Sequence, residues 1–319
     1  PVERIHHNLL AGDPEAPGYA VLLNSHLDTV PPSESWESDP FAPLDTGQMI
    51  IGLGSNDAGA SMVCMLAAFA QMRDKLTEDI NLLLLISAEE EVSGSKGISA
   101  VLPRLGALDA VIVGEPTGMA PAVAERGLMV LDGSVKGKAG HAARSEGENA
   151  IYGAMKDLEA IQKLQFEKQS EWLPEPSAQV TMISAGTRHN VVPDHCSYVV
   201  DVRSNDRYSN EILLEKIRSV CVAELNPRSM RLKSSGLEQD HLLMKAIESS
   251  GLEPFGSSTL SDMALIPFPA VKMGPGESSR SHSAGEYILK SELEQGVAGY
   301  CRFLKHIEHA KLAHHETLG

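Results

Sequence analysis

The chain has 319 residues, of which 42% are hydrophobic and 22% are charged, a composition that suits one large globular domain or two smaller ones. Its formal net charge of -16 argues against a nucleic-acid partner or an anionic membrane and suits a protein that collects divalent cations. No apolar run approaches the roughly 18 residues that span a bilayer, so we expect no membrane span, and we see no secretion leader. The four cysteines form no CxxC pair and are interpreted as reduced thiols of a cytoplasmic protein.

The first third of the chain alternates strand and helix signals. Apolar runs predict buried strands at residues 20–23, 80–86 and 110–113, and small apolar residues at helical spacing predict a helix at 58–72. Continuous apolar strands separated by helices imply a parallel sheet that is covered on both faces. Because the first strand comes so soon after Pro1, we expect that a segment is missing from the front of the chain.

The middle of the chain predicts a smaller α+β unit. Strands are expected at residues 128–135, 179–183, 197–203 and 230–233, and helices at 149–164 and 210–225. Their order, β-α-β-β-α-β, is that of a ferredoxin-like unit. In the first of these helices Ile151, Met155, Leu158 and Ile161 fall on one stripe, which predicts the buried face.

The alternation of strand and helix signals seen in the first third of the chain returns after Gly236. A helix is expected near residues 242–249, a strand at 270–273, and a long C-terminal helix from about Ser291. The pattern therefore predicts a larger α/β domain made of residues 1–123 and 235–319, with a smaller domain at 124–234 inserted into it.

Polar residues cluster where the predicted buried strands end. The clusters are His26 and Asp28, Glu89–Glu91, Glu115 and His282, and Asp57 stands just before the first helix. Parallel sheets place ligands at the carboxyl ends of their strands, so we expect these residues to meet at one edge. Each cluster is weak by itself, because a lone histidine is usually structural and an acidic run is usually a solvated turn. Together they would repel strongly without cations, and mixed histidine and carboxylate ligation suits zinc in a catalytic site.

Seven dispersed motifs carry a resemblance to a known family. In chain order they are "SHLDTVP", "GLGSNDAG", "AEEEVSG", "VGEPT", "GKAGHAA", "RHNVVPD" and "SRSH". With them the chain resembles the M20 family of zinc-dependent aminoacylases and exopeptidases, in the branch of acetylornithine deacetylase and succinyl-diaminopimelate desuccinylase. The resemblance implies a zinc-exopeptidase-like α/β fold, whose mixed, mainly parallel sheet is flanked by helices and whose inserted ferredoxin-like domain serves dimerisation or acts as a lid. Leu53 and Gly59 stand where relatives often carry Arg and Lys, and neither is an expected metal ligand.

The resemblance also implies a ligand set. Two zinc ions per chain are expected, for which cobalt or manganese can substitute. Asp57 would bridge the two ions, His26 and Glu115 would hold one of them, and Glu91 and His282 would hold the other.

Further roles are carried over from the same resemblance. Asp28 would orient His26 and fix its tautomer, and Glu90 would act as general base toward a metal-activated water. His141 would reach the oxyanion from the partner subunit of a homodimer, although by itself it reads as a surface-loop histidine. Asn190 and Arg203 would bind substrate; Arg203 would grip a carboxylate or, alternatively, form an ion pair inside the inserted domain.

The expected function is removal of the acyl group from small α-N-acyl amino acids, with N-acetylornithine or N-acetylcitrulline of arginine synthesis as the expected substrates. A succinyl-amino-acid desuccinylase and a dipeptidase or aminopeptidase of the same family remain alternatives. An alternative of another class is a metal-binding protein without catalysis, against which the intact Glu90 weighs, because a binder needs no general base.

Overall fold

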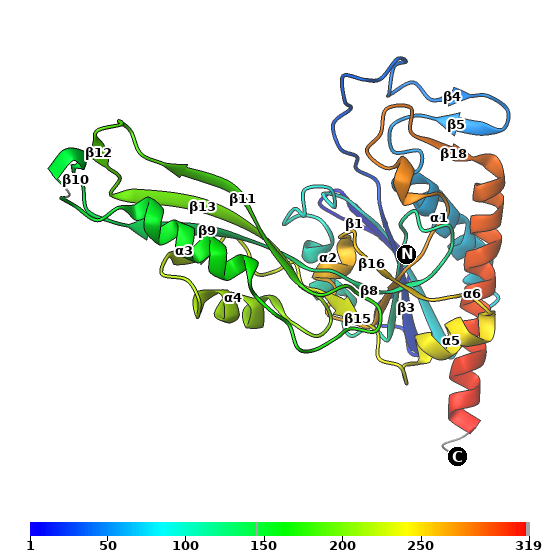
Figure 1. Ribbon diagram of the computed structural model, residues 1–319. Helices are drawn as coiled ribbons and strands as arrows, with labels where there is room; N and C mark the ends of the chain where they lie inside the picture. The colour runs from blue at the N-terminus through cyan, green and yellow to red at the C-terminus, as the bar shows by residue number, and fades with distance from the viewer. Residues whose placement is uncertain (145, 317–319) are drawn as a thin grey trace. The chain divides into compact units, whose positions relative to one another are not determined.

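The computed structural model describes residues 1–144 and 146–316 (Figure 1). The chain divides into two compact units. Unit 1 comprises Pro1–Val123, Gly236–Gly256 and Ser261–Gly319, and unit 2 comprises Ala124–Ser235 and Ser257–Leu260. No helix in the described part of the chain is long and apolar enough to cross a membrane.

A mixed sheet forms the centre of unit 1, with the strand order β1-β2-β6-β3-β7-β17-β8-β15 and with β16 paired to β8. The strands are β1 (Val2–Ile5), β2 (Asn8–Ala11), β3 (Tyr19–His26), β6 (Ile80–Ser87), β7 (Ala110–Val113), β8 (Ala122–Glu125), β15 (Ser235–Gly236), β16 (Phe255–Ser257) and β17 (Ala270–Lys272). The four central strands β6, β3, β7 and β17 run parallel, whereas β1 and β2 form an antiparallel hairpin on one side. The sequence did not predict this hairpin, because only Asn8 and Leu10 in it are buried and no apolar run marks it.

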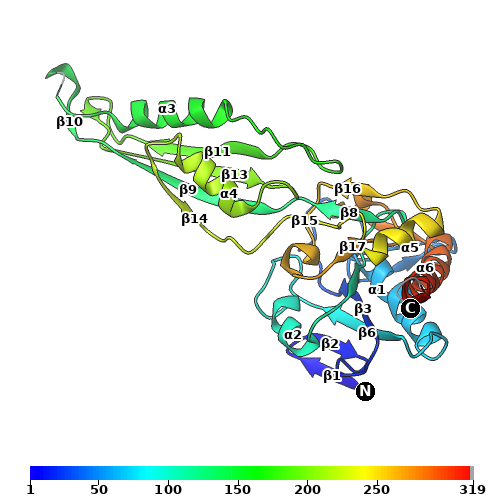
Figure 2. The same cartoon turned by 90° about the horizontal axis from the view of Figure 1, so that it is seen from below.

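Helices cover both faces of this sheet (Figure 2). On one face lie α1 (Gly59–Met72), α5 (Leu242–Ser250) and α6 (Lys290–Glu316), and on the other lies α2 (Ile98–Leu105) with the short helix η2 (Asp262–Leu265). Leu22, Leu83 and Val111 of the sheet pack against Val101 of α2 and Met263 of η2. All eight residues of β3 are buried, which is why residues 20–23 form a continuous apolar run rather than an alternating pattern.

A small antiparallel sheet also belongs to unit 1. Its strands, in the order β18-β5-β4, are β18 (Tyr287–Leu289), β5 (Met49–Ile51) and β4 (Leu44–Asp45). The pairing of Tyr287 with Ile51 joins a segment near the C-terminus to the chain just before α1.

Unit 2 is built on a four-stranded antiparallel sheet in the order β11-β13-β9-β14. Its strands are β9 (Leu128–Lys136), β11 (Ser177–Ala185), β13 (His195–Arg203) and β14 (Glu224–Pro227), and its helices are α3 (Ala150–Gln162) and α4 (Asn210–Arg218). Both helices share one core with the sheet, in which Ala154 and Leu213 pack with Met129 and Tyr198. The chain order of these elements is the predicted β-α-β-β-α-β.

Two predictions within unit 2 were wrong at the end of α4. The helix ends at Arg218 instead of continuing to Leu225, which lies in β14, and residues 230–233 form no strand. The cause is a long-range contact, because the carboxylate of Asp157 on α3 accepts hydrogen bonds from the backbone N–H groups of Val222 and Ala223. These bonds satisfy the backbone in a non-helical conformation and lead it into the sheet.

The same aspartate explains a second correction, on the buried face of α3. Ile161 is buried and Leu158 packs against the core, as predicted, but Met155 is 57% exposed, and the helix buries Ala150, Ala154 and Asp157 as well. Tyr198 donates its hydroxyl hydrogen to Asp157, so this carboxylate is satisfied inside the core. Because Asp157 can be buried in this way, the buried face of α3 is turned relative to the face that apolar spacing alone predicts.

Candidate metal centre

The candidate ligands of the metal centre all belong to unit 1 and sit where its parallel strands end. His26 is the last residue of β3 and pairs in register with Ser87, the last residue of β6, so Glu90 and Glu91 emerge beside it. Glu115 follows β7 by two residues. Asp57 and His282 reach the same place from the loop before α1 and from the loop after β17.

Asp57 lies between the two histidines with one carboxylate oxygen toward each. Its Oδ1 is 3.3 Å from Nε2 of His26, and its Oδ2 is 3.6 Å from Nε2 of His282. Glu115 Oε1 is 3.6 Å from the same nitrogen of His26, and Glu91 Oε2 is 3.2 Å from the same nitrogen of His282. The ligands therefore form two groups that share only Asp57, the pairing that the resemblance implies.

These separations provide a test of fit for a metal ion. Ligands about 2.0–2.1 Å from a tetrahedral zinc lie roughly 3.4 Å from one another. The measured nitrogen–oxygen distances of 3.2–3.6 Å agree with that spacing in both groups. Each group offers three protein ligands, which leaves a position open, as in catalytic rather than structural zinc sites. The residues present therefore fit two divalent ions, and the donor set does not single out zinc.

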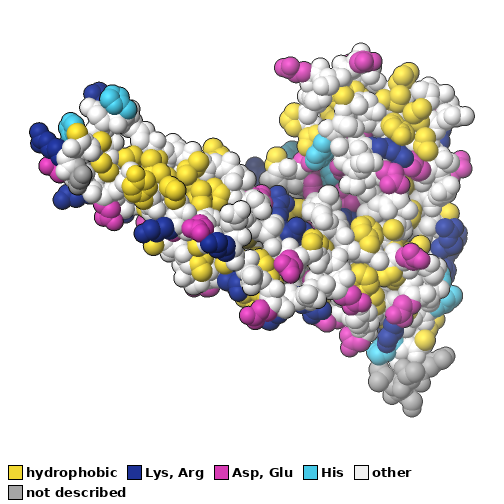
Figure 3. Space-filling view, in the orientation of Figure 1, with side chains coloured by type: hydrophobic (Ala, Val, Ile, Leu, Met, Phe, Trp, Pro, Cys, Tyr) yellow, Lys and Arg dark blue, Asp and Glu magenta, His cyan; other side chains and the backbone are white. Residues whose placement is uncertain are grey.

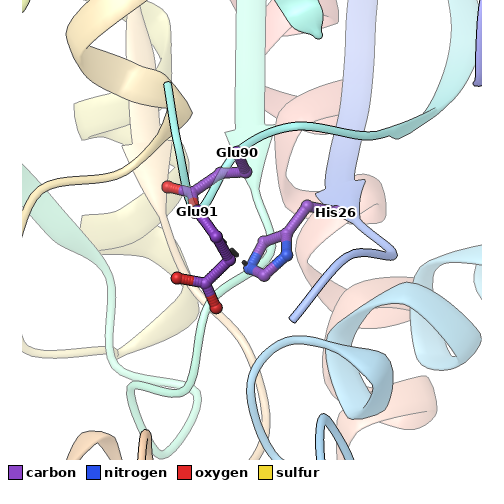
Figure 4. Close-up of side chains that lie close together, drawn as sticks. All are labelled: His26, Glu90 and Glu91. Atoms are coloured by element: carbon purple, nitrogen blue, oxygen red, sulfur yellow. Dashed lines mark ion pairs between the residues drawn. The ribbon is translucent and has the colours of Figure 1, made fainter. Parts of the chain in front are cut away.

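Glu90 lies beside His26, a ligand of the first group (Figure 4). Its Oε2 is 3.9 Å from Nε2 of His26, a longer distance than those of Asp57 and Glu115. Burial raises the pKa of Glu90, and the charge of Glu115 raises it further, to about 9. The Glu90 carboxylate is thus near the cation site but farther from His26 than the ligands Asp57 and Glu115 are. At that distance it can exchange a proton with a water molecule bound at the site.

The carboxylates around His26 favour its protonated form. Burial alone lowers the pKa of His26, but the hydrogen bond to Asp57 and the charges of Glu115 and Glu90 outweigh it and raise the pKa to about 11. Burial opposes ionisation of Asp57 as well, yet its contacts with His26 lower its pKa. In the absence of cations the site thus holds a proton where a cation would sit, so cation binding must release it.

Asp28 is close to His26 but orients it in a different way from the one expected. Nδ1 of His26 lies 2.9 Å from the backbone carbonyl oxygen of Asp28 and 3.7 Å from its carboxylate. The carbonyl therefore sets the tautomer, with the proton on Nδ1 and with Nε2 facing the ligands. The Asp28 carboxylate instead accepts hydrogen bonds from the backbone N–H groups of Glu90 and Glu91, each at 3.2 Å. It holds the loop that carries both glutamates.

Glu89, the first of the three consecutive glutamates, shapes the loop that carries the other two. Its backbone adopts a left-handed conformation with φ 58°, and its carboxylate accepts a hydrogen bond from the backbone N–H of Lys96. The turn that Glu89 makes directs the next two glutamates toward His26.

Two of the predicted site residues of unit 2 lie side by side. The short strands β10 (Gly140–His141) and β12 (Val191–Val192) pair with His141 opposite Val191, and the backbone N–H of Ala142 donates to the carbonyl of Asn190. His141 is exposed, and its Nδ1 accepts a hydrogen bond from the backbone N–H of Ala143. The pairing brings the backbone of Asn190 beside that of His141 and Ala142.

Arg203 lies at the opposite end of the unit 2 sheet. It closes β13, a nine-residue strand that begins at His195, so the two ends are roughly 26 Å apart. Its Nε and Nη2 donate to Oδ1 and Oδ2 of Asp201 at 2.7 and 3.0 Å, which is the ion pair that we weighed as the alternative to a substrate clamp. Two of its five N–H donors are already committed within unit 2.

Sequence reasoning missed two buried carboxylates of unit 1. Asp262 accepts hydrogen bonds from Asn24 of β3 and Ser87 of β6, just before the strand ends that carry the ligands. Glu286 accepts from the loop that carries Asp57. Neither follows an apolar strand, and their partners lie more than 170 residues away in the chain, so no local pattern could have indicated them.

The α/β sheet of unit 1 thus gathers histidine and carboxylate groups at its strand ends into a candidate centre for divalent ions. Residues 22–306 match peptidase family M20/M25/M40, and the chain belongs to this family. The predicted resemblance is thereby confirmed at the level of the family.

The individual relatives share about 30% or less of their sequence with this chain. The succinyl-diaminopimelate desuccinylase of Acidiphilium cryptum (strain JF-5) is 30% identical over 204 residues, and the match covers 60% of this chain and 54% of that protein. The acetylornithine deacetylase of Myxococcus xanthus is 28% identical over 328 residues, which cover 96% of this chain and 84% of that protein. The chain thus spans little more than half the length of the desuccinylase.

A solved structure supports the fold. The YXEP protein of Bacillus subtilis, described as a dinuclear metal binding peptidase from the M20 family, has a TM-score of 0.69 over 97% of this chain and 86% of its own. Its sequence identity is 17%, so the likeness concerns the fold. It confirms the predicted fold class of a mainly parallel sheet flanked by helices.

Proposed function

We propose that the protein is a two-metal amidohydrolase that removes the acyl group from small α-N-acyl amino acids. The observation that carries the proposal is the position of Asp57, whose two oxygens face two different histidines, each with its own glutamate. A carboxylate so placed serves two cations at once, and two cations a few ångströms apart are a recurrent device for hydrolysis.

When bound, the two ions would supply positive charge that lowers the pKa of a water molecule and polarises the amide carbonyl. Glu90 accepts the proton from the attacking water and passes it to the amine nitrogen as the carbon–nitrogen bond breaks. Asp28 holds Glu90 in place through the backbone of the glutamate loop. The raised pKa of Glu90 falls when cations replace the proton on His26, which returns Glu90 to the ionised form that a base requires.

Asp57→Asn gives a direct test of the shared ligand. The carboxamide retains one oxygen and turns an NH₂ group toward the second ligand group, so we expect one bound zinc per chain instead of two, by elemental analysis after dialysis. Asp45→Asn is the matched control, because Asp45 is an exposed aspartate of β4 that pairs with Lys290. Two zinc ions in Asp57→Asn, or fewer than two in the unchanged chain, would contradict the shared site.

The substrate part of the proposal rests on the relatives. The two curated relatives named above are a succinyl-diaminopimelate desuccinylase and an acetylornithine deacetylase. Both names describe removal of an acyl group from an amino acid, and we propose N-acetylornithine or N-acetylcitrulline as the preferred substrates, with succinyl analogues next. Cleavage of unblocked dipeptides is the second candidate, because the similar solved structure is described as a peptidase.

A substrate panel separates these candidates. It comprises acetyl, succinyl and formyl derivatives of ornithine, citrulline, glutamate and diaminopimelate, together with free dipeptides, each assayed with and without added zinc. We expect zinc-dependent release of the acyl group from ornithine or citrulline. Rapid cleavage of dipeptides without turnover of any acylated amino acid would favour the peptidase, and no turnover at all would favour a metal-binding protein without catalysis.

We further propose that two copies associate through unit 2. Strand β11 lies at the edge of its sheet, and Met182 and Ile183 on it are 65% and 53% exposed. Tyr152 and Met155 add exposed apolar surface on α3, and Figure 3 shows hydrophobic side chains gathered over this part of unit 2. An open sheet edge with apolar side chains pairs readily with a second copy of itself, and such a dimer would bring His141 and Asn190 to the partner's site.

The oligomeric state tests this pairing. Light scattering should give the mass of a dimer, and Met182→Lys together with Ile183→Lys should give that of a monomer, since charges on an edge strand oppose pairing. A dimer that survives both substitutions would place the interface elsewhere.

A further inference from the structure

Glu286 is a buried carboxylate that the mechanism does not use. It is 2% exposed and lies four residues after His282, immediately before β18. A carboxylate that is removed from water must find hydrogen-bond donors within the protein, because burying it unpaired is costly.

The donors of Glu286 all belong to the loop that carries Asp57. Oε1 accepts from the backbone N–H groups of Asn56 and Asp57, at 2.9 and 2.8 Å, and Oε2 accepts from that of Gly54, at 3.0 Å. The backbone carbonyl of Glu286 accepts from the N–H of Gly52. The hydroxyl of Ser55 donates to the same carbonyl, so Glu286 holds five residues of this loop.

A second contact ties the same loop to the segment that carries His282. The side chain of Asn56, which is fully buried, donates from Nδ2 to the carbonyl of Glu277 and accepts at Oδ1 from the N–H of Glu277. Gly276, with φ 86°, passes so close that an added Cβ would lie 2.2 Å from Oδ1 of Asn56. The segment that supplies His282 is therefore held against the Asp57 loop at both of its ends, by Asn56 at one end and Glu286 at the other.

We propose that Glu286 is a positioning residue that sets the separation between Asp57 and His282 before any ion binds. This inference rests on the proposed two-metal site and extends it to a residue that touches neither ion. Two ligands from segments 225 residues apart in the chain must be held within a few ångströms of one another. Charge-assisted hydrogen bonds from three backbone N–H groups of one loop are strong enough to hold them. Groups that orient metal ligands typically account for 10–100-fold in metal affinity.

The test compares Glu286→Gln and Glu286→Asp with the unchanged chain. Glutamine keeps the shape but presents an NH₂ group to one backbone N–H, and aspartate keeps the charge but shortens the reach. We expect zinc affinity to fall roughly 10–100-fold in both variants by competition with a chelator. In metal-free protein, hydrogen exchange of residues 52–58 should be faster in both variants. Glu294→Gln, an exposed glutamate on α6, is the control for the loss of one charge and should change neither measurement.

Each outcome decides the question. Unchanged zinc affinity and unchanged exchange in Glu286→Gln would overturn the proposal, and so would wild-type affinity in Glu286→Asp. If Glu286→Gln gives no folded protein, Glu286→Asp carries the test alone, and wild-type affinity there overturns the proposal. If the unchanged chain fails to bind two ions, the proposed function fails, while the exchange of residues 52–58 still shows whether Glu286 holds the loop.

Discussion

The free energy of unfolding of the metal-free protein should fall as the pH rises, because two buried groups of the metal centre hold protons in the folded state. The pKa of His26 is raised from 6.5 to about 11, and that of Glu90 from 4.5 to about 9. Between pH 6.5 and 9 the folded chain therefore binds about two protons more than the unfolded chain. Both folded-state values lie above the unfolded ones, so the stability associated with these protons is present at low pH and is lost as the pH rises.

The size of the effect follows from proton linkage. Each additional bound proton changes the free energy of unfolding by about 1.4 kcal/mol per pH unit, so two protons set an upper limit of about 3 kcal/mol per pH unit. A rise from pH 7 to pH 8.5 would remove roughly 4 kcal/mol at that limit, a large share of the 5–15 kcal/mol that stabilises a typical domain. The loss has a simple physical source: without protons or cations, Asp57, Glu90, Glu91 and Glu115 repel one another at close range.

Urea unfolding followed by circular dichroism, at several pH values between 6.5 and 9, measures this dependence. With a chelator present, stability should decline as the pH rises. With excess zinc the decline should disappear, because cations replace the protons. Glu90→Gln removes one of the two titrating groups and should reduce the slope by about half. A stability that stays level or rises with pH in the chelator would refute the account of the protonated, cation-free site.

Three further experiments test the roles of individual residues. Glu90→Gln should keep both zinc ions and lose roughly 10²–10⁴-fold in turnover, whereas Glu91→Gln should lose zinc; the reverse pattern would mean that the two roles are exchanged. Mixing inactive His141→Ala chains with inactive Glu90→Gln chains should restore activity through hybrid dimers, and no recovery despite subunit exchange would exclude action across the dimer. Arg203→Ala should impair cleavage of an acyl amino acid far more than cleavage of its methyl ester; equal impairment would leave Arg203 only its ion pair with Asp201.

Much of the metal centre could be predicted because its ligands follow buried strands. Short apolar runs at residues 20–23, 82–86 and 110–113 precede His26, Glu90 and Glu115, and parallel strands bring their carboxyl ends to one edge whatever the details of packing. His282 follows its strand at a greater distance, and its place depends on how the intervening loop is held.

Features that depend on long-range contacts could not be predicted. The burial of Asp157, the end of α4 at Arg218 and the start of β14 all result from hydrogen bonds between α3 and a segment some 65 residues away. Apolar spacing predicted Met155 to be buried because it treats every polar residue as solvent-facing, and Asp157 breaks that rule with three donors inside the core.

The sequence by itself determined which residues could bind metal, since residue chemistry and strand-end position are both local properties. Only the tertiary structure decided how those residues are held. It showed that the carbonyl of Asp28 sets the tautomer of His26 while its carboxylate holds the glutamate loop. It also showed that Glu286 holds the backbone around Asp57. The physical reason is that backbone N–H groups are identical at every position, so which carboxylate accepts from them is decided by the fold and leaves no mark in the local sequence.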